Sequence, residues 1–272
     1  DFHGQLTPLS ATADSFTDDE SFSQSAAVGG AAFLKPWFEA YRVDAPGLVL
    51  TVTSGDAVGA TPPISAFFDD TPTVEIMNLM GFSADGLGNH NFDKGYQHMT
   101  DTLEPLAQFP YLSINVVDDQ GNTPAAWSPS QVFEVDGARI ALIGFTNTDA
   151  PTLVFPNAFG PYQVVDPIPL ISEEAARLRG EGVAAVVAMG HEGATGGTLT
   201  EPSGPLVVTA DGVAGVDAVV GDHTDVQVLA TRPNGVLVTE NRSKGVAFTR
   251  VRLTIDTASG SVVYKTADHH RP

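Results

Sequence analysis

The chain contains no cysteine and few basic residues, and both absences narrow what it can be. Without cysteine, disulfides and thiolate metal sites are excluded, so any metal centre has to use nitrogen and oxygen ligands. Only 13 of the 272 residues are lysine or arginine, against 33 aspartates and glutamates, which gives a formal charge of −20. A nucleic-acid polymer or an anionic membrane surface needs a basic face, so neither is an expected partner.

Long apolar runs are also missing from the sequence. No stretch approaches the roughly 18 apolar residues of a membrane span, and no signal peptide is present. The chain opens abruptly at Asp1-Phe2-His3 without an apolar strand ahead of it, so we expect a truncated start there. Hydrophobic residues still make up 42% of the chain, enough to bury the core of one large α/β domain or two small ones.

Apolar patterning predicts alternating helices and strands in the first part of the chain. The predicted helices are Ala26–Tyr41, Thr73–Met80, Tyr96–Ala107 and Ile171–Gly180. The predicted strands are Gly47–Thr53, Ala84–Leu87, Tyr111–Val117, Val183–Met189 and Val216–Val220. Pro36 is expected to kink the first helix or to begin its second part. Thr7–Ser25 reads as a surface loop, and Pro151–Pro169 as an irregular one.

Two dipeptides predict tight turns. Asp136-Gly137 is expected to join Val132–Val135 and Arg139–Phe145 in a hairpin, and Asn234-Gly235 predicts a turn in a final antiparallel run. That run consists of Val226–Ala230, Val236–Glu240, Ala247–Ile255 and Val262–Lys265. Early alternation and a strand-rich end predict an α/β fold with mixed sheets. No repeat or linker forces a second domain, so one domain over residues 1–272 is expected.

The polar stretch Gly88–Asp93, reading Gly-Asn-His-Asn-Phe-Asp, carries the clearest chemistry. Asn89 can offer a metal a neutral oxygen ligand, and His90 is the side-chain type that changes charge near neutral pH. Asp93 can hold the imidazole of His90 in one tautomer, as the third group behind a catalytic acid or base does. Its alternative role is to cap the following helix.

Other residues of metal-binding type follow the predicted strands. They are Asp56 after Gly47–Thr53, His191 after Val183–Met189, and His223 and Asp225 after Val216–Val220. Asp1 and His3 are expected to follow a strand that this chain lacks. Because ligands gather beyond the carboxyl ends of strands in α/β proteins, these residues predict a cage of oxygen and nitrogen donors. Two metals fit such a cage if one carboxylate bridges them.

The order of these motifs resembles the calcineurin-like metallophosphoesterases, and most of all their 5′-nucleotidase branch. The family's Asp-x-His, Gly-Asp, Gly-Asn-His-Glu/Asp, Gly-His and Gly-His-x-His motifs appear as Asp1-Phe2-His3, Gly55-Asp56, Gly88-Asn89-His90, Gly190-His191 and His223-Thr224-Asp225. Gly88–Gly95 and Gly29-Gly30 are typical of the nucleotidase branch. The resemblance spans Asp1 to about Ile255, and it implies two packed mixed β-sheets flanked by helices, a four-layer sandwich.

The resemblance also implies residue roles. Asp1, His3 and Asp56 would bind a first divalent ion, and Asp56 would bridge to a second ion held by Asn89, His191 and His223. His90 would be the catalytic histidine, oriented by Asp93. The two ions would be Zn, Mn, Fe or Co. Asp225 stands where the family has His, and Asp222 where it has Gly; Asp225 is still expected to bind metal, as a harder, charged donor.

The implied activity is two-metal phosphoester hydrolysis, with nucleoside 5′-monophosphates as the leading substrates. Alternatives on the same site are 2′,3′-cyclic nucleotides, nucleotide sugars and dinucleotides. The nucleotidases' C-terminal domain, which stacks the base, is expected to be absent from this chain. A metal-stabilised binding or surface module without turnover is therefore the rival hypothesis. The acidic excess and the missing cysteines predict an exported protein, in the periplasm, the cell wall or outside the cell, with no oligomeric state predicted.

Overall fold

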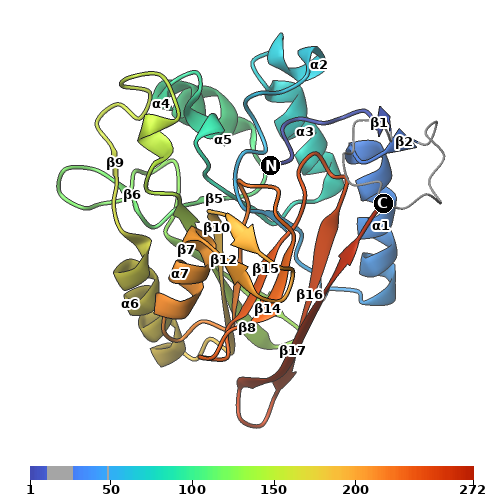
Figure 1. Ribbon diagram of the computed structural model, residues 1–272, viewed down its shortest axis with the longest axis vertical. Helices are drawn as coiled ribbons and strands as arrows, with labels where there is room; N and C mark the ends of the chain where they lie inside the picture. Colours follow the sequence, from blue (N-terminus) through green and yellow to red (C-terminus); the bar gives the residue numbers. More distant parts are fainter. Residues whose placement is uncertain (11–26, 48) are drawn as a thin grey trace.

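The computed structural model describes residues 1–10, 27–47 and 49–272. Two β-sheets pack face to face, and helices cover the outer face of each sheet (Figure 1). The prediction of an α/β sandwich built from two packed sheets and flanking helices is therefore confirmed. No helix in the described ranges is long and apolar enough to cross a membrane.

The larger sheet is mixed. Its strands are β7 (Ser130–Val135), β8 (Ala138–Thr146), β10 (Ala185–His191), β13 (Ala218–Val220), β14 (Val228–Thr231) and β15 (Leu237–Glu240). They lie in the order β14-β15-β13-β10-β8-β7. The four inner strands run parallel, and β7 and β14 pair antiparallel at the edges. Strand β10 is buried at every position, as its unbroken apolar run requires of a parallel strand covered on both faces.

The smaller sheet is parallel and consists of β3 (Val52–Thr53), β4 (Ala84–Gly86) and β5 (Tyr111–Leu112). Its outer face packs against α1 (Ala31–Asp44), α3 (Thr71–Met80) and a helical segment. That segment consists of α4 (Tyr96–His98), a π-helical turn (Met99–Leu103) and α5 (Glu104–Leu106). It confirms the helix predicted over Tyr96–Ala107.

A buried apolar layer separates the two sheets. Ala84 and Leu112 of the smaller sheet contact Leu142, Val187 and Met189 of the larger sheet in this layer. On the far side of the larger sheet lie α6 (Pro167–Gly180) and α7 (Pro205–Gly212). Their apolar side chains and those of the sheet form the second core.

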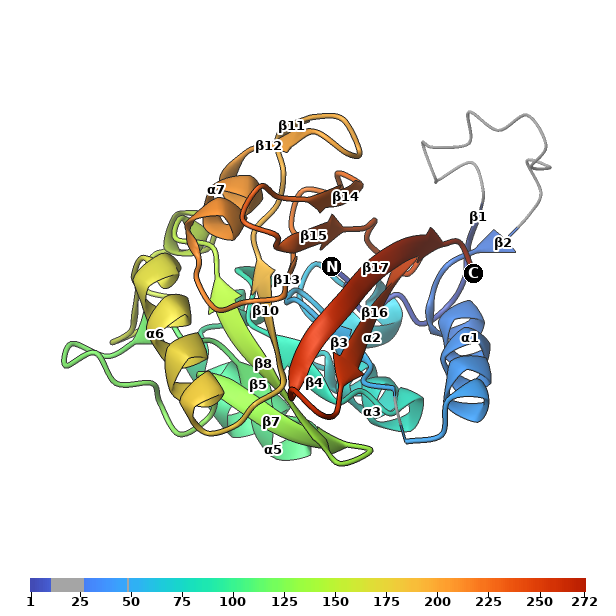
Figure 2. The same ribbon diagram turned by 90° about the horizontal axis from the view of Figure 1, so that it is seen from below.

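A long terminal hairpin of β16 (Phe248–Asp256) and β17 (Ser261–His270) crosses one end of the sandwich (Figure 2). Its residue Ala267 packs on the layer between the sheets, and Phe248 lies edge-on to Trp37 of α1. The remaining elements of the described part of the chain are short: β1 (Leu9–Ser10), β2 (Ala27–Val28), α2 (Pro63–Ala66), β6 (Val116–Val117), β9 (Gln163–Val164), β11 (Gly196–Gly197), β12 (Pro202–Ser203) and two 3-10 helical turns, His90–Phe92 and Ala150–Thr152.

The turn at Asp136-Gly137 is as predicted. Strand β7 ends at Val135 and β8 begins at Ala138, so these two residues form a two-residue loop. Both have positive φ, 49° and 78°, which is the signature of a type I′ turn. At Asn234-Gly235 the connection is wider, because the last pair across it is Thr231 and Leu237.

Three predicted elements of the first part of the chain differ from the structure. The predicted strand Gly47–Thr53 is limited to β3, Val52–Thr53, among the described residues. Helix α1 begins at Ala31 and continues through Pro36 to Asp44, while residue 26 and most of Thr7–Ser25 lie outside the described residues. The predicted strand Tyr111–Val117 is two strands, β5 and β6. It is interrupted because Asn115 leaves the smaller sheet and exchanges hydrogen bonds with the main chain of Thr146 in β8.

Later in the chain, helix α6 begins at Pro167 instead of Ile171. The Asp166 side chain accepts a hydrogen bond from Ile168 N, and proline fits the first turn because its missing donor has no partner there. Helix α7 was not predicted. The final run is only partly antiparallel, because β15 also pairs in parallel with β13.

Glycine at position 190 is enforced by packing. A Cβ on Gly190 would lie 2.2 Å from the ring of Phe145, which is fully buried. We expect Gly190→Ala to lower the free energy of unfolding by about 1–3 kcal/mol, as overpacking does. The matched control is Gly180→Ala at the end of α6, where no atom beyond the neighbouring residues and the helix's own backbone lies within 4 Å of the new Cβ. Urea denaturation measures both, and equal stability of the two variants would contradict the packing assignment.

Candidate metal centre

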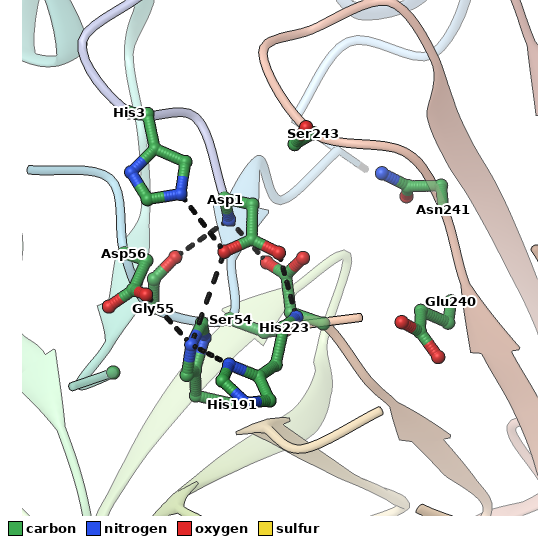
Figure 3. A network of polar contacts seen from close by, with 12 residues as sticks. Asp1, His3, Ser54, Gly55, Asp56, His191, His223, Glu240, Asn241 and Ser243 are labelled. Carbon is green, nitrogen blue, oxygen red and sulfur yellow. Dashed lines mark hydrogen bonds and ion pairs between the residues drawn. The ribbon is translucent and has the colours of Figure 1, made fainter. Parts of the chain in front are cut away.

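Five of the predicted metal-binding residues gather where the strands of both sheets end: Asp1, His3, Asp56, His191 and His223 (Figure 3). Asp56 follows β3 and Asn89 follows β4 of the smaller sheet. His191 is the last residue of β10, and His223 follows β13 of the larger sheet. The carboxyl ends of parallel strands meet at one edge of a sheet, and here the edges of two sheets adjoin.

The first residues of the chain lie between these two groups. The backbone N–H of His3 donates to the carbonyl of Asp56 at 3.0 Å. On the other side, Oδ2 of Asp1 accepts a hydrogen bond from the backbone N–H of His223 at 2.7 Å. The Asp1–His3 segment therefore connects the loop after β3 with the loop after β13.

Three sets of side chains place one ligand atom each within 4.8 Å of the others: Asp1, His3 and Asp56; Asp56, His191 and His223; and Asp1, His191 and Asp222. Within them, His191 Nε2 lies 2.9 Å from Asp56 Oδ2 and 3.0 Å from His223 Nδ1. His3 Nε2 lies 3.4 Å from Asp1 Oδ1. Two of the sets share the carboxylate of Asp56.

Unusual backbone angles hold this arrangement. His3, Asp56 and His223 have positive φ values of 47°, 48° and 85°. Such conformations cost non-glycine residues about 1–3 kcal/mol each and are common at functional sites. Gly88 makes room for them, because a Cβ there would lie 2.1 Å from Asp56 Oδ1. Strained backbone conformations at these residues thus bring their side chains together.

Asn91 is a supporting residue that the sequence did not single out. It is buried, and its Oδ1 accepts hydrogen bonds from the backbone N–H groups of Gly88 at 2.8 Å and Asp56 at 3.2 Å. The backbone N–H of His90 donates to Asp56 Oδ1 at 2.8 Å. These hydrogen bonds therefore hold the loops after β3 and β4 together. The only sequence signal was a second asparagine in the Gly88–Asp93 stretch.

The charges in the site suit cation binding. Burial disfavours the charge on Asp56, but His191, His90 and His3 together outweigh it, so the pKa of Asp56 is held well below its ordinary value. Burial lowers the pKa of His3, and burial together with His191 lowers the pKa of His223. These two imidazoles are therefore neutral at neutral pH, which is the form that binds a metal.

His90 and Asp93 form a separate pair beside these ligands. Nδ1 of His90 and Oδ2 of Asp93 lie 2.7 Å apart, and both side chains are about one-third exposed. The hydrogen bond that His90 donates to Asp93 raises the pKa of His90, in the opposite direction to the shifts of His3 and His223. The ring of His90 lies edge-on to that of His3, 5.2 Å between centroids.

Divalent metal ions fit the residues present. Asn89 Oδ1 and His191 Nδ1 are buried without a hydrogen-bond partner. Asp1, Asp56 and Asp222 are buried residues, and buried negative charge needs a compensating cation. All the donors are nitrogen or oxygen, the set that suits first-row divalent metals.

Among the described aspartates and histidines that were predicted as ligands, only Asp225 belongs to none of these sets. It is exposed, with a φ of 59°, and its Oδ1 accepts a hydrogen bond from the backbone N–H of Ser243 at 2.7 Å. It belongs to none of the three sets of ligand atoms found among the described residues. Asp222, which was not predicted as a ligand, is buried and belongs to one of them.

Glu240, the last residue of β15, supports the two loops that carry His191 and His223. It is fully buried, and its Oε2 accepts a hydrogen bond from Ala194 N at 2.7 Å. Thr224 Oγ1 lies 2.7 Å from Glu240 Oε1 and 2.5 Å from the Ala194 carbonyl, but a hydroxyl has one proton for these two acceptors. A proton on Glu240 resolves this shortage, and burial raises the pKa of Glu240 to about 8.

Comparisons with known proteins agree with this geometry. No protein-family model matches the chain. The chain is 31% identical over 216 residues to the cell wall protein Lmo0130 of Listeria monocytogenes, and 29% identical over 223 residues to the 5′-nucleotidase of Rattus norvegicus. The solved calcineurin-like phosphoesterase YfkN from Bacillus subtilis covers all of this chain with a TM-score of 0.79 at 22% identity, and 88% of YfkN is matched.

Fold, motif order and site geometry together define a calcineurin-like metallophosphoesterase, and the chain belongs to that family. Within the family it is similar in sequence to the 5′-nucleotidases. The alignments cover 70% and 80% of this chain but 26% of Lmo0130 and 36% of the rat enzyme. The chain thus spans about a quarter to a third of the length of these relatives.

Replacement of Glu240 tests the support that it gives to the two loops. We expect Glu240→Ala to destabilise the protein by about 1–3 kcal/mol, because buried donors lose their partner. Gln at this position offers an oxygen to Ala194 N and an amide to Thr224, so Glu240→Gln should keep the fold.

The pH dependence of stability tests the protonation of Glu240. Its pKa in the native state, about 8, lies above its ordinary value of 4.5. Between these values the unfolded carboxyl ionises while the native one stays protonated, so wild-type stability falls as pH rises. Glu240→Gln should lose this part of the pH dependence. Denaturation of metal-free protein between about pH 4.5 and 8 measures it, and parallel curves for the two proteins would refute the assignment.

Proposed function

We propose that this chain is the catalytic domain, residues 1–272, of a phosphoester hydrolase that uses two divalent cations and acts on nucleoside 5′-monophosphates. The observation that carries the proposal is the sharing of Asp56 between two ligand sets. Asp1 and His3 accompany it in one set, and His191 and His223 accompany it in the other. A shared carboxylate is what a bridging ligand between two neighbouring ions requires.

In this proposal Asp1, His3 and Asp56 hold one ion. Asp56, Asn89, His191 and His223 hold the other, and the unpartnered Oδ1 of Asn89 supports its place in the set. When bound, two such cations activate water for attack and polarise the phosphoryl group. The nitrogen and oxygen donors are compatible with Zn, Mn, Fe or Co.

His90 is the residue that we assign to the leaving group. Asp93 occupies its Nδ1, so Nε2 is the atom free to face the ester oxygen. The hydrogen bond that His90 donates to Asp93 raises the pKa of His90 and favours the protonated ring. The protonated Nε2 donates its proton to the departing oxygen, and Asp93 keeps the ring turned for that transfer.

The names of the relatives support nucleotides as substrates, since several are called 5′-nucleotidases. The same site chemistry is compatible with 2′,3′-cyclic nucleotides, nucleotide sugars and dinucleotides. The rival proposal, a metal-stabilised binding module without turnover, draws support from Asp225, which is exposed and apart from the other predicted ligands. Metal-dependent hydrolysis of an aryl phosphate separates turnover from binding alone.

The leaving group decides whether His90 acts as an acid. We expect His90→Asn to keep both ions but to lower kcat for AMP by about 10²–10⁴-fold, the range that general acids contribute. A ribose 5′-alkoxide needs a proton to leave, whereas a nitrophenolate leaves as a stable anion. The loss on nitrophenyl phosphate should therefore be smaller by at least about a factor of ten. The measurement is kcat on both substrates at matched metal occupancy.

Two further variants serve as a test of Asp93 and as a control in that experiment. Asp93→Asn should reproduce part of the His90→Asn defect by freeing the ring, and His98→Asn, at a histidine outside the site, should leave kcat unchanged. Equal losses on both substrates would show that His90 stabilises phosphoryl charge instead of donating a proton. Absence of metal-dependent turnover in the wild type would favour the binding module.

We also propose that the protein is exported. The formal charge of −20 with no cysteine is compatible with this location, and one relative is named a cell wall protein. Fractionation of cells that express the full-length gene should recover the protein in the periplasm, the cell wall or the medium. Recovery in the cytosol alone would overturn this proposal.

A further inference from the structure

Two aspartates in one loop are candidates for the same role, that of a metal ligand. Asp222 and Asp225 both follow β13, and His223 lies next to the first of them. Asp225 occupies the position of the family's last ligand, whereas Asp222 occupies a position where the family has glycine. The two differ in environment, because Asp222 is 8% exposed and Asp225 belongs to the exposed residues.

The carboxylate of Asp225 is bound by another loop and belongs to none of the sets of ligand atoms found among the described residues. Its left-handed φ of 59° is compatible with the hydrogen bond from the backbone N–H of Ser243 to its Oδ1, at 2.7 Å. This bond fixes the side chain to the loop after β15. Among the described residues, Asp225 shares no set of ligand atoms with Asp1, Asp56 or the histidines.

The carboxylate of Asp222, in contrast, lies among the ligand atoms. One of its oxygens lies within 4.8 Å of ligand atoms of both Asp1 and His191. Its Oδ2 also accepts a hydrogen bond from the main-chain nitrogen of Asp1 at 2.6 Å. A carboxylate has two oxygens, so one can hold Asp1 while the other faces a cation. Nearby, the buried Oδ1 of Asn89 has no partner, an independent sign that the site is completed by a ligand.

We infer that Asp222, and not Asp225, supplies the carboxylate of this loop to the metal centre. The inference rests on the proposed function, since it names a ligand of the same two ions. In this assignment the ligand at the family's position, Asp225, is replaced by Asp222, three residues earlier in the chain. The loop would thus keep its count of metal-binding side chains although the histidine of the family motif is missing.

Binding of Mn²⁺ by purified protein tests this assignment, with equilibrium dialysis and elemental analysis as the readout. Asp222→Asn and Asp225→Asn form a matched pair, because both remove one charge from the same loop. We expect Asp222→Asn to weaken binding of at least one ion by about tenfold or more, as loss of one carboxylate ligand warrants. Asp225→Asn should bind both ions within about twofold of the wild type, a change of less than about 0.5 kcal/mol.

The asparagine at position 222 also separates ligation from support. It keeps an oxygen that accepts the hydrogen bond from Asp1, so a purely structural role predicts unchanged affinity. If Asp222→Asn does not fold, as judged by near-ultraviolet circular dichroism, Asp222→Ser replaces it and still offers an oxygen. Loss of affinity in Asp225→Asn with normal binding in Asp222→Asn, or normal binding in both, would overturn the inference.

Asp56→Asn distinguishes failure of this inference from failure of the proposed function. If the two-metal site is correct, Asp56→Asn loses ions that the wild type binds, whatever the outcome at position 222. A wild type that binds no pair of ions, with Asp56→Asn indistinguishable from it, would overturn the proposed function and this inference with it.

Discussion

The buried carboxylate of Asp56 is the interaction on which the site depends. Its Oδ2 contacts His191 at the end of the larger sheet, and its Oδ1 accepts the backbone N–H of His90 in the smaller sheet's loop. A single side chain therefore orders both the cluster of ligands and the residue assigned to the leaving group. The left-handed backbone at Asp56 and the glycine at position 88 are conditions for this double contact.

Histidines in this small region have different tasks because their surroundings differ. Burial keeps His3 and His223 neutral, so their ring nitrogens can donate electron pairs to a cation. His90 is more exposed and has Asp93 as a partner, which favours the charged ring. Burial and one carboxylate are thus sufficient to separate metal binding from proton donation among side chains of one type.

The sequence predicted what is local. Motifs at strand ends and the turn residues Asp136-Gly137 require no knowledge of distant contacts, and both lie where they were expected. Contacts between distant segments could not be predicted from the sequence. The bond from Ser243 to Asp225 and the pairing of β15 with β13 join residues far apart in the chain. Glu240 looked like the end of an apolar strand, and only the fold shows which loops it joins.

The site takes its ligands from both sheets, and this has a mechanical consequence. Asp56 and Asn89 move with the smaller sheet, whereas His191 and His223 move with the larger one. The spacing between the two groups of donors is therefore set by the thickness of the apolar layer around Leu112 and Met189. Ions bound at this edge would link the two sheets. A change of side-chain volume in the apolar layer would therefore alter the metal coordination.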